Sequence, residues 1–417
     1  MRLAIFTSEF PSHVSTFLAR DIRGLLEAGI EVDVFPVRDP DGSLWQFVPD
    51  ILNEATFPRE RVHHLTMPRC LASAWPWSLS SFGKLLRDTI GVCASAAQYG
   101  PIPLAKSLYV LPKACAWARR PPGEYDHVLS YWGNYAATCA REFHRLVGRP
   151  VPFSMFLHAG TDLYRTRVYM KQKLLYADNV FVVCEFNREY IRQKYPRLFP
   201  RIAQKIHLHH LGLNLADLPF QAEGRIPQRV VGVGRLDRRK GFDYLLRAAG
   251  ELTRRGVDVD VQLVGGGQEE GNLRRLAADL GLGNRVTFLG WQPFAEVQAA
   301  MARAAVLVHP SPEIGDAVPT VIKEAQAVGT PVVGTTVAGI PELLDFGRSG
   351  ILVPPREVIP LADAIGRLLA DTSLRQQYAL AGRQFAETHY DMWQNGRQLA
   401  DRLRATVRHG AHQDTNP

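Results

Sequence analysis

Residues 309–333 read HPSPEIGDAVPTVIKEAQAVGTPVV, and this stretch decides the fold class. The apolar run before it predicts a strand that ends at His309, followed by a loop that extends to Pro319. A helix then runs over 319–328, Gly329 closes it, and another apolar strand follows. A strand, a crossover helix and a second strand in this order predict parallel pairing in an α/β layer.

The same alternation extends outward over most of the chain. Short apolar strand patterns occur at 1–8, 30–37, 127–132, 152–158 and 179–184, and again at 229–236, 259–267, 284–291, 304–311, 330–336 and 349–355. The polar stretch 220–229 between the two series reads as a linker. We therefore expect an α/β fold of two doubly wound, Rossmann-like domains that face each other across a cleft, with ligands outside the carboxyl ends of the strands. The predicted organisation is a first domain over 1–218, a second over 219–390, a helix over 391–409 that packs back toward the first domain, and a disordered tail over 410–417.

Composition excludes several classes of protein. The chain has 417 residues, of which 46% are apolar and 22% charged, and these values are typical of globular domains rather than disordered or collagen-like chains. No window reaches the ~18 apolar residues of a membrane-spanning helix. The first apolar run meets Glu9 too early for a signal peptide. The five cysteines lack metal-ligand spacing, which argues against structural zinc. We expect a cytoplasmic protein.

Charge is unevenly distributed along the chain. Residues 51–205 contain 22 Lys+Arg against 10 Asp+Glu, whereas the rest contains 27 against 31. The basic part is expected to attract an anionic partner, which could be nucleic acid, a membrane surface or a phosphorylated substrate. The other interpretation is an ordinary solvated basic surface.

The stretch 70–120 departs from the strand–helix alternation. Its aromatic and apolar side chains alternate with cations, and they include Trp75, Trp77, Phe82, Leu85, Leu86, Tyr109, Leu111 and Trp117 beside Lys84, Arg87, Lys106, Lys113, Arg119 and Arg120. This pattern is typical of helices that lie in a membrane interface over anionic lipid. It equally fits an amphipathic helical pair that covers the first sheet while its cations extend to water.

Two cations follow the first strand of the second series. Arg235 lies near the end of the pattern VVGVGRL (230–236), and Lys240 precedes the next helix. A diphosphate needs this combination of positive charge and aligned backbone donors. Gly232 and Gly234 form only a weak dinucleotide fingerprint, because the third glycine is missing at the required spacing. A solvated loop is the alternative.

Two carboxylates flank the start of the predicted helix at 319–328. Asp316 lies in the loop, where it can face a sugar, and Glu324 lies within the helix, where it can reach a ribose. Free backbone N–H groups over 318–321 point toward an anion placed between them. Helix capping by Asp316 would give the same sequence pattern, so spacing alone leaves both readings open.

These motifs together resemble a known family. The matching segments are VGRLDRRKG (233–241), LVGGGQEEGNLRRLAADLGLGNRVTFLGW (263–291), DAVPTVIKEAQAVGTPVV (316–333), AGIPELL (338–344) and GILVPP (350–355). In this order they resemble the nucleotide-sugar glycosyltransferases of family 4, which are retaining enzymes with the fold called GT-B. The resemblance covers nearly the whole second domain.

The resemblance implies roles for individual residues. Glu324 matches the second Glu of the family's Glu-x7-Glu motif, which holds the nucleotide ribose, and Asp316 stands at the first Glu with a shorter side chain. Arg235 and Lys240 match the diphosphate-binding pair. The donor-binding set implied in this way comprises Arg235, Lys240, Gly265, Gly266, Asp316, Val318, Pro319, Thr320, Val321 and Glu324, with Arg235, Lys240, Asp316 and Glu324 also expected to act in catalysis.

The first half resembles the family less strongly. Its loop SEFPSHVSTF (8–17) looks like that of the subgroup that makes colanic acid and related bacterial exopolysaccharides, and LHAGTDLYR (157–165) looks like that subgroup's His-Gly-x-Asp segment. His158 then matches the catalytic-site histidine that reaches the donor sugar, although a histidine at a strand end is more often structural. The residues expected to form the loops of the acceptor domain are Ser12, Ser15, Thr16, Gly160 and Asp162.

The expected activity is retaining transfer of a hexose from a nucleoside diphosphate sugar, with a UDP-sugar favoured, to a saccharide acceptor. The resemblance implies a lipid-linked acceptor at the inner membrane face, in the synthesis of exopolysaccharide, lipopolysaccharide or glycolipid. We expect no metal and no cofactor, because Asp39-x-Asp41 and Asp258-x-Asp260 lie away from the predicted cleft motifs. No RNP-like strand points to nucleic acid. The alternative is a non-catalytic nucleotide-sugar-binding protein with the same fold. The presence of Asp316 where the family has a glutamate would support this alternative.

Overall fold

The computed structural model describes residues 1–12, 16–38, 52, 55–73, 79–148, 150–221 and 223–413. Several residues singled out in the sequence lie outside these ranges, namely Ser15, Asp39, Asp41, Trp75 and Trp77. Contacts along the chain group the protein into two units, of which one comprises residues 1–212 and 392–417 and the other residues 213–391. The sequence interpretation had placed the domain boundary at 218.

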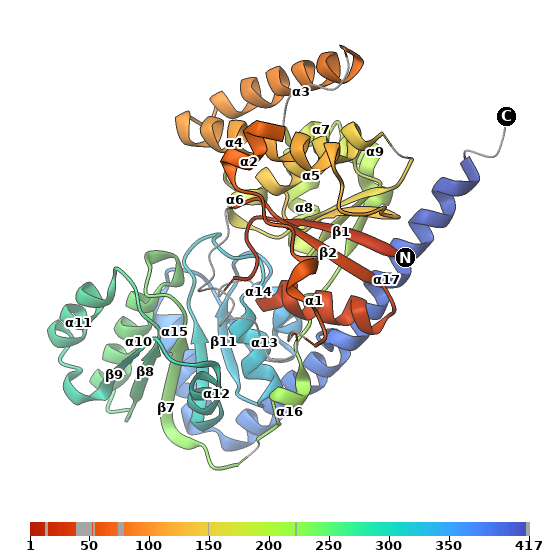
Figure 1. Ribbon diagram of the computed structural model, residues 1–417. Coiled ribbons are helices and arrows are strands. Elements are labelled where there is room, and N and C mark those ends of the chain that lie inside the picture. Colours follow the sequence, from red (N-terminus) through yellow and green to blue (C-terminus); the bar gives the residue numbers. More distant parts are fainter. Residues whose placement is uncertain are drawn as a thin grey trace. The chain divides into compact units, whose positions relative to one another are not determined.

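The first unit is built on a six-stranded parallel sheet (Figure 1). Its strands, in the spatial order β2-β1-β3-β4-β5-β6, are β1 (Arg2–Thr7), β2 (Glu31–Pro36), β3 (His127–Ser130), β4 (Phe153–Leu157), β5 (Asn179–Val182) and β6 (Ile206–Leu208). Every residue of β3, β4 and β5 is buried. Their continuous apolar runs are explained by cover on both faces, as parallel sheets require.

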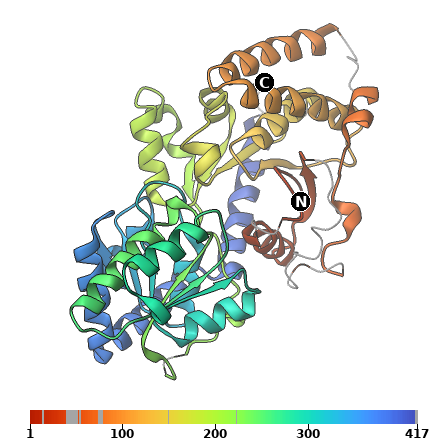
Figure 2. The same cartoon turned by 90° about the vertical axis from the view of Figure 1, so that its left-hand side faces the viewer.

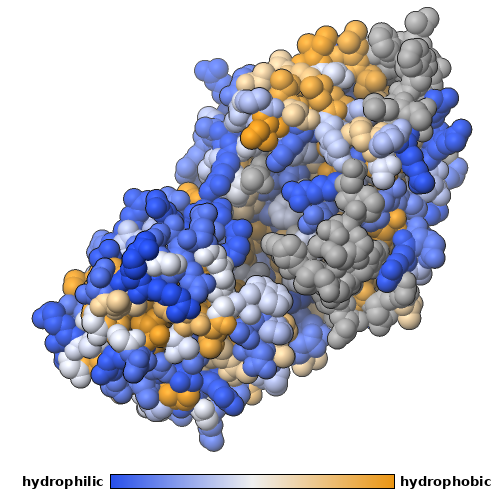
Figure 3. All heavy atoms as spheres, turned by 60° about the vertical axis from the view of Figure 1, so that its left-hand side comes forward, coloured by the Kyte–Doolittle hydropathy of each residue, from blue (hydrophilic) through white to orange (hydrophobic). Residues whose placement is uncertain are grey.

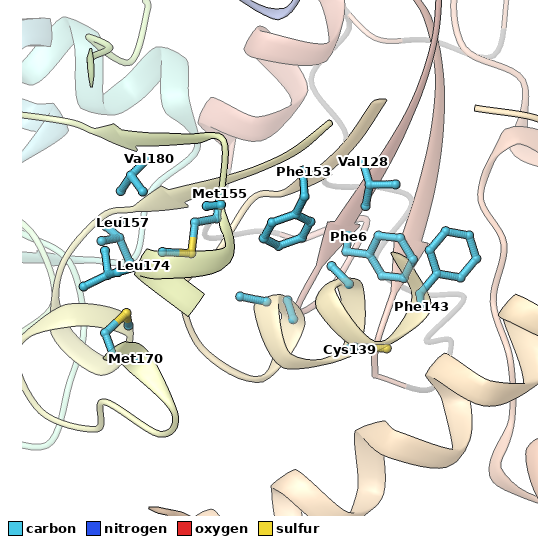
Figure 4. Packing of buried hydrophobic residues seen from close by; sticks show 14 of the residues in the cluster. Phe6, Val128, Cys139, Phe143, Phe153, Met155, Leu157, Met170, Leu174 and Val180 are labelled. Carbon is cyan, nitrogen blue, oxygen red and sulfur yellow. The ribbon is translucent and has the colours of Figure 1, made fainter. Parts of the chain in front are cut away.

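One face of this sheet packs on a dense apolar cluster. Figure 4 shows Phe6 of β1 beside Phe143, and Phe153 and Met155 of β4 beside them. The Phe6 and Phe143 ring centroids lie 5.0 Å apart. Trp117 also belongs to this cluster and is buried, so for this residue the interpretation as a cover for the sheet holds and the membrane-interface interpretation does not.

Helices surround this sheet and extend beyond it. They are α1 (Thr16–Glu27), α2 (Met67–Ser73), α3 (Leu79–Ala97), α4 (Pro101–Arg119), α5 (Tyr135–Val147), α6 (Gly160–Leu163), α7 (Met170–Tyr176), α8 (Glu185–Lys194), α9 (Phe199–Ile202) and α17 (Met392–Gln413). The described parts of the stretch 70–120 thus form helices, among which α4 packs on α5 and α3 packs on α4. Figures 1 and 2 both show α3 as the outermost helix of this group.

The last helix belongs to the first unit rather than to the second. α17 packs along α1, and the two helices cross at Gly24 and Gly396. A Cβ atom added at Gly396 would lie 2.6 Å from the Cα of Gly24, so any side chain there would force the backbones apart. Arg23 lies over the Trp393 ring at 5.2 Å, which adds a cation–π contact to the same crossing.

The second unit holds another six-stranded parallel sheet. In the order β12-β11-β10-β7-β8-β9 its strands are β7 (Ile226–Val233), β8 (Asp260–Val264), β9 (Val286–Gly290), β10 (Ala304–His309), β11 (Val332–Thr335) and β12 (Ile351–Val353). Strand β7 begins at Ile226, inside the stretch predicted as a linker. Ile226 pairs with Ala304 of β10, and Arg229 stands opposite Asp260 of β8, with which it forms an ion pair at 2.7 Å.

Helices cover both faces of the second sheet. They are α10 (Phe242–Arg254), α11 (Glu270–Asp279), α12 (Phe294–Arg303), α13 (Thr320–Ala327), α14 (Ile340–Leu343), α15 (Val358–Ala370) and α16 (Thr372–His389). One apolar cluster joins the sheet to α10, α11 and α15, and another joins it to α12, α13 and α14. Two doubly wound parallel sheets with helices on their faces confirm the predicted fold class.

Candidate active site

The order of strands in the second sheet creates a switch point between β7 and β10. These strands are neighbours, and from them the chain winds outward through β8 and β9 on one side and through β11 and β12 on the other. Connections on the two sides leave toward opposite faces, so a crevice opens outside the carboxyl ends of β7 and β10. The loops 234–241 and 310–319 therefore meet at the place where ligands bind in such sheets.

The loop after β7 carries a network of fixed cations. Asp237 accepts hydrogen bonds from the backbone N–H of Arg239 and from its guanidinium, at 3.0 and 2.8 Å. Arg235 pairs with the same carboxylate at 3.2 Å while its side chain remains 68% exposed. Burial raises the pKa of Asp237, but Arg239 and Arg235 outweigh that effect and hold it below the ordinary value. Asp237 thus positions two guanidinium groups without removing Arg235 from water.

Lys240 and Asp316 come together across the switch point. The ammonium of Lys240 donates to Oδ2 of Asp316 at 2.6 Å. Burial raises the pKa of Asp316, but the positive charge of Lys240 and smaller contributions from its neighbours bring it below the ordinary value. Asp316 is therefore ionised at neutral pH. Two residues that are 76 positions apart in sequence form one charged pair at the sheet edge.

His309 closes the end of β10 behind this pair. Its side chain is buried, and Nε2 lies 3.1 Å from the hydroxyl of Ser311. Burial, with the nearby charge of Lys240 adding to it, lowers the pKa of His309 to about 3, so the ring is neutral. The Nδ1 atom has no hydrogen-bond partner within the described part of the chain.

Two glycines allow the loops to approach so closely. Gly241 has φ +69°, and an added Cβ would lie 2.1 Å from the carbonyl oxygen of Pro310. Gly265, after β8, has φ +134°, and its Cβ would lie 1.9 Å from the carbonyl oxygen of Gly234. Both positions exclude every other residue type on steric grounds. Gly266 next to it faces open space, which leaves that backbone accessible to a ligand.

Helix α13 begins beside the charged pair. Its N-cap is Pro319, and no side chain caps it, so the first backbone N–H groups at Thr320 and Val321 lack partners within the helix. Val318 and Val321 pack against the apolar cluster on this face of the sheet. Glu324 lies within α13 and is buried at 8% exposure. The predicted donor-binding residues thus occupy three neighbouring strand ends and one helix N-terminus.

Glu313 does not join Asp316 in this arrangement. It pairs with Arg356 at 3.6 Å and lines a cavity of about 400 Å³ together with Arg238, Asp243 and Glu269. That cavity is also lined by Phe242 at the start of α10 and by Pro312 of the 310–319 loop. Glu313 therefore pairs with a different cation from the one that holds Asp316.

His158 follows β4 in the first unit. Its Nε2 donates to the carbonyl oxygen of Tyr131 at 2.8 Å, and it is enclosed by aromatic rings, of which Trp132 is 4.5 Å away between centroids. Burial lowers the pKa of His158 to about 4, so the ring is neutral with its proton on Nε2. Nδ1 is left as a lone-pair acceptor that is unpaired among the described residues.

The loop after His158 is held by its own carboxylate. Asp162 accepts from the backbone N–H groups of His158 and Ala159, each at 2.8 Å. Burial raises the pKa of Asp162 to about 6, although these hydrogen bonds oppose the shift. Gly160 starts α6 with φ +36°. Asp162 and Gly160 thus shape the loop that carries His158, and Asp162 turns its oxygens inward.

The other predicted loop residues are placed as follows. Ser12 is half-buried in the loop after β1, and Thr16 is the half-buried first residue of α1.

Three residues of the site, Asp237, His309 and Ser311, are not indicated as site residues by the sequence. For Asp237 a signal was present, because an acid between Arg235 and Arg239 is an N-cap pattern. For His309 no local pattern distinguishes a site residue from a buried strand end.

Comparisons with known proteins fit this arrangement. Residues 227–371 match the family model described as "Glycosyl transferases group 1". The amylovoran biosynthesis glycosyltransferase AmsK of Erwinia amylovora is 27% identical over 97% of this chain and 99% of its own. A GDP-mannose-dependent alpha-(1-6)-phosphatidylinositol monomannoside mannosyltransferase of Mycolicibacterium smegmatis is 36% identical over 42% of this chain and 47% of its own.

The protein is a glycosyltransferase. Its fold is GT-B, since the structure of Anabaena Alr3699/HepE in complex with UDP superimposes with a TM-score of 0.69 over 97% of this chain and 100% of that one, at 19% identity. The residues of the switch point, Arg235, Lys240, Asp316 and Glu324, all lie within the part of the enzyme that matches the group 1 family.

The carboxylates of the enzyme's Asp258-x-Asp260 segment are engaged elsewhere. Asp260 pairs with Arg229 across the sheet, and Asp258 pairs with Arg285. Within the described ranges, no group of three or more His, Cys, Asp or Glu side chains is arranged to hold a metal ion.

Proposed function

We propose that the enzyme transfers a hexose from a nucleoside diphosphate sugar to a saccharide acceptor with retention of the anomeric configuration, as a family 4 glycosyltransferase. The observation that supports this most directly is the switch point of the second sheet. There Arg235, Lys240 and Asp316 meet the uncapped N-terminus of α13. Cations and free N–H groups suit a diphosphate, and a carboxylate suits sugar hydroxyls.

The reaction exchanges one bond for another at the anomeric carbon. The bond from this carbon to the β-phosphate oxygen breaks, and the acceptor hydroxyl oxygen forms a new bond on the same face. The acceptor's proton passes to the leaving β-phosphate, so no separate base is required. Arg235, Lys240 and the α13 amides stabilise the negative charge that develops on that phosphate. Arg235 already stands exposed and oriented by Asp237.

The sugar itself is oriented by the remaining polar groups in this proposal. Asp316 accepts hydrogen bonds from sugar hydroxyls, and Glu324 holds the ribose. His158 is neutral at physiological pH, since burial lowers its pKa to about 4, and its Nδ1 is a lone-pair acceptor. A neutral acceptor can bind a hydroxyl group without adding charge beside the leaving diphosphate. Asp162 and Gly160 act through the loop that carries His158.

A UDP-sugar is the favoured donor. HepE, whose fold matches along its whole length, was solved with UDP. The mannosyltransferase relative is named as GDP-mannose-dependent, and GDP-mannose is therefore the second candidate. The full-length similarity to a protein named for amylovoran biosynthesis supports a role in bacterial exopolysaccharide, lipopolysaccharide or glycolipid synthesis.

We further propose that the acceptor is lipid-linked and that the enzyme works as a peripheral protein on the inner face of the cytoplasmic membrane. None of the helices that the structure describes combines the length and the apolar composition needed to cross a bilayer. The excess of Lys and Arg over residues 51–205 supports attraction to phosphate groups of the acceptor or of the membrane.

Metal independence is part of the same proposal. The positive charges at the switch point come from Arg235, Arg239 and Lys240, and these can take the place that a divalent cation has in other sugar transferases. Asp258 and Asp260 each have an arginine partner, which supports a structural role for that segment.

A thermal-shift panel tests the proposal. The full chain is heated with UDP, GDP, ADP, CMP or dTDP at millimolar concentration, with and without EDTA. A nucleotide at ~100 times its dissociation constant adds about 2.7 kcal/mol of stability. We expect UDP to raise the melting temperature most, with no effect of EDTA.

The other outcomes are equally informative. A shift with GDP alone would replace the donor assignment, and loss of the shift in EDTA would contradict metal independence. If no nucleotide stabilises the chain, the assignment of the switch point as a donor site fails. Nucleotide binding without release of UDP from any UDP-sugar would favour the non-catalytic alternative.

A further inference from the structure

The helical hairpin formed by α3 and α4 exposes large apolar side chains. Leu86 and Ile90 on α3 are 48% and 60% exposed, and Ile102 and Leu108 on α4 are 66% and 48% exposed. We call these four residues the hairpin face. In Figure 3, residues coloured as hydrophobic gather on the part of the first unit that carries α3 and α4. Single exposed leucines need no explanation, but four on one pair of packed helices form a patch.

The hairpin is held in place by its other side, so the exposed residues are not needed for packing. Val92 and Ala96 on the inner side of α3 are buried against Val168, with Leu104 of α4 beside them. α4 in turn packs on α5. Ala94 and Ala97, which follow Ile90 on α3, are also exposed, so they extend the apolar surface of this helix toward its end.

Charge around the hairpin face has one sign. Asp88 is the only acidic residue between positions 61 and 123. It is buried on the inner side of α3, where it pairs with Arg145 and with Arg141. The side chains of Arg87 and Lys106, in contrast, are exposed. The hairpin therefore presents cations and apolar groups to solvent and keeps its single carboxylate inside.

We propose that the hairpin face inserts into the interface of an anionic lipid bilayer. An apolar helix face flanked by cations, and free of acids, matches a surface whose headgroups are negative and whose acyl chains lie just beneath them. A second copy of this chain would bring the same cations against its own and would be repelled. The inference deepens the proposed function, since it places the hairpin at the membrane that would carry a lipid-linked acceptor.

The interpretation of 70–120 as a cover for the sheet also holds in part. α4 buries Val110, Leu111 and Trp117 in the core of the first unit, and Lys113 is fully buried with them. The membrane surface therefore does not include the second half of α4. It consists of the outward side of α3 and the first half of α4.

The experiment is co-sedimentation of the full chain with vesicles of phosphatidylcholine alone or with phosphatidylglycerol, at low and high salt. The test variant combines Leu86→Gln, Ile90→Gln, Ile102→Gln and Leu108→Gln. Glutamine removes the apolar surface but still favours the helical conformation. A matched control combines Leu380→Gln and Ile359→Gln, which are 61% and 50% exposed on helices of the second unit. A third variant combines Arg87→Gln and Lys106→Gln.

We expect the wild-type chain and the control to bind vesicles that contain phosphatidylglycerol, more weakly at high salt. The four-residue variant should bind at least about tenfold more weakly, because each buried leucine-sized side chain contributes to partitioning. The charge variant should lose the salt-dependent part of binding and keep a smaller salt-independent part.

Each opposing result overturns the inference. Failure of the wild-type chain to bind, binding that does not depend on phosphatidylglycerol, or equal binding by the four-residue variant would do so. A wild-type dimer that the same variant dissociates, without vesicle binding, would assign the hairpin face to a second copy. The thermal shift with UDP is measured on every variant, so that loss of folding or of nucleotide binding is distinguished from loss of lipid binding.

Discussion

The carboxyl edges of the two sheets hold their polar groups in opposite ways. After β4 in the first unit, His158 is buried among aromatic rings and Asp162 is satisfied by backbone N–H groups. After β7 and β10 in the second unit, charged side chains pair with one another and remain accessible, with Arg235 68% exposed and Asp316 51% exposed. One edge is built around a neutral ring and the other around ionic groups.

The difference shows how each edge is suited to its proposed task. Ion pairs at an exposed edge can exchange partners, so Lys240 can release Asp316 when a diphosphate arrives. A neutral, buried imidazole keeps its orientation because its packing and its hydrogen bond to Tyr131 fix it. The ionic edge should therefore fail when charges are removed, and the neutral edge should respond to changes in packing and pH.

Removal of the Lys240 charge should have the largest effect. In Lys240→Met, we expect UDP release in the presence of acceptor to fall about 10²–10³-fold, as for loss of one preorganised donor to a developing oxyanion. The matched control is Arg238→Met, a neighbouring cation whose side chain is 84% exposed and pairs with Glu269. Equal losses in the two variants would mean that net charge, and not the position of Lys240, matters.

Substitution of Gly241 should destabilise the second unit, because a side chain there would clash with the loop after β10. We expect Gly241→Ala to lower the free energy of unfolding by about 2 kcal/mol or more, because φ is +69° and the new Cβ would meet the Pro310 carbonyl oxygen at 2.1 Å. Urea denaturation measures this effect. Gly266→Ala is the control, with nothing within 4 Å of its added Cβ, and it should unfold like the wild type. Destabilisation of both variants to the same extent would contradict the contact.

Substitutions of Asp316 should have a smaller effect on the transfer rate, and they distinguish the role of its negative charge from that of its side-chain length. We expect Asp316→Asn to lower the transfer rate about tenfold, since a hydrogen bond to a charged group contributes ~1.5–3 kcal/mol. Asp316→Glu, which has the family's longer side chain, should keep the rate within a few-fold. The measurement is kcat/KM for the donor. A collapse in Asp316→Glu with an intact Asp316→Asn variant would show that space, rather than charge, governs this position.

The neutral state of the buried His158 ring should affect how the free energy of unfolding depends on pH. Burial lowers the pKa of His158 from 6.5 to about 4, so the unfolded chain binds a proton over this range and the native chain does not. The neutral His158 therefore costs no stability above pH 6.5. The free energy of unfolding falls as the pH drops from 6.5 toward 4, because only the unfolded chain binds the proton. His158→Phe should reduce this slope by up to ~1.4 kcal/mol per pH unit.

Urea denaturation between pH 7 and pH 4.5 provides the measurement for His158→Phe. Trp132→Phe serves as the control, because it changes the ring nearest to His158 without removing a titratable group. Its slope should equal that of the wild type, even if its stability is lower. An unchanged slope in His158→Phe would mean that the imidazole is protonated in the native protein.

Local patterns explain why the second unit was the easier to predict from sequence. Arg235, Lys240 and Asp316 stand at fixed distances from strand and helix boundaries, and the doubly wound strand order brings those boundaries together. The pairing of Lys240 with Asp316 follows from β7 lying next to β10. Strand β6 was missed because its three residues are too few to show an apolar pattern.

The first unit depends more on contacts that sequence patterns do not show. The sequence left open whether Trp117 lies at a membrane interface or covers the first sheet, and it packs edge-on against Phe6 and Phe35 at 5.8 and 5.4 Å. The preference of a tryptophan for a core or a surface is set by its neighbours in space. The lack of a hydrogen-bond partner for Nδ1 of His158 and of His309 among the described residues likewise results from tertiary packing, and no spacing in the chain could have indicated it.

The crossing of α1 and α17 at Gly24 and Gly396 also sets an order of assembly during translation. The strands of the first sheet and α1 leave the ribosome early, but the helix that covers α1 is synthesised only after the whole second unit. Until residue 392 and its successors have emerged, α1 can pack on β2, but its side around Gly24 lacks the helix that covers it in the folded protein. The unit that is started first is therefore the one that is finished last.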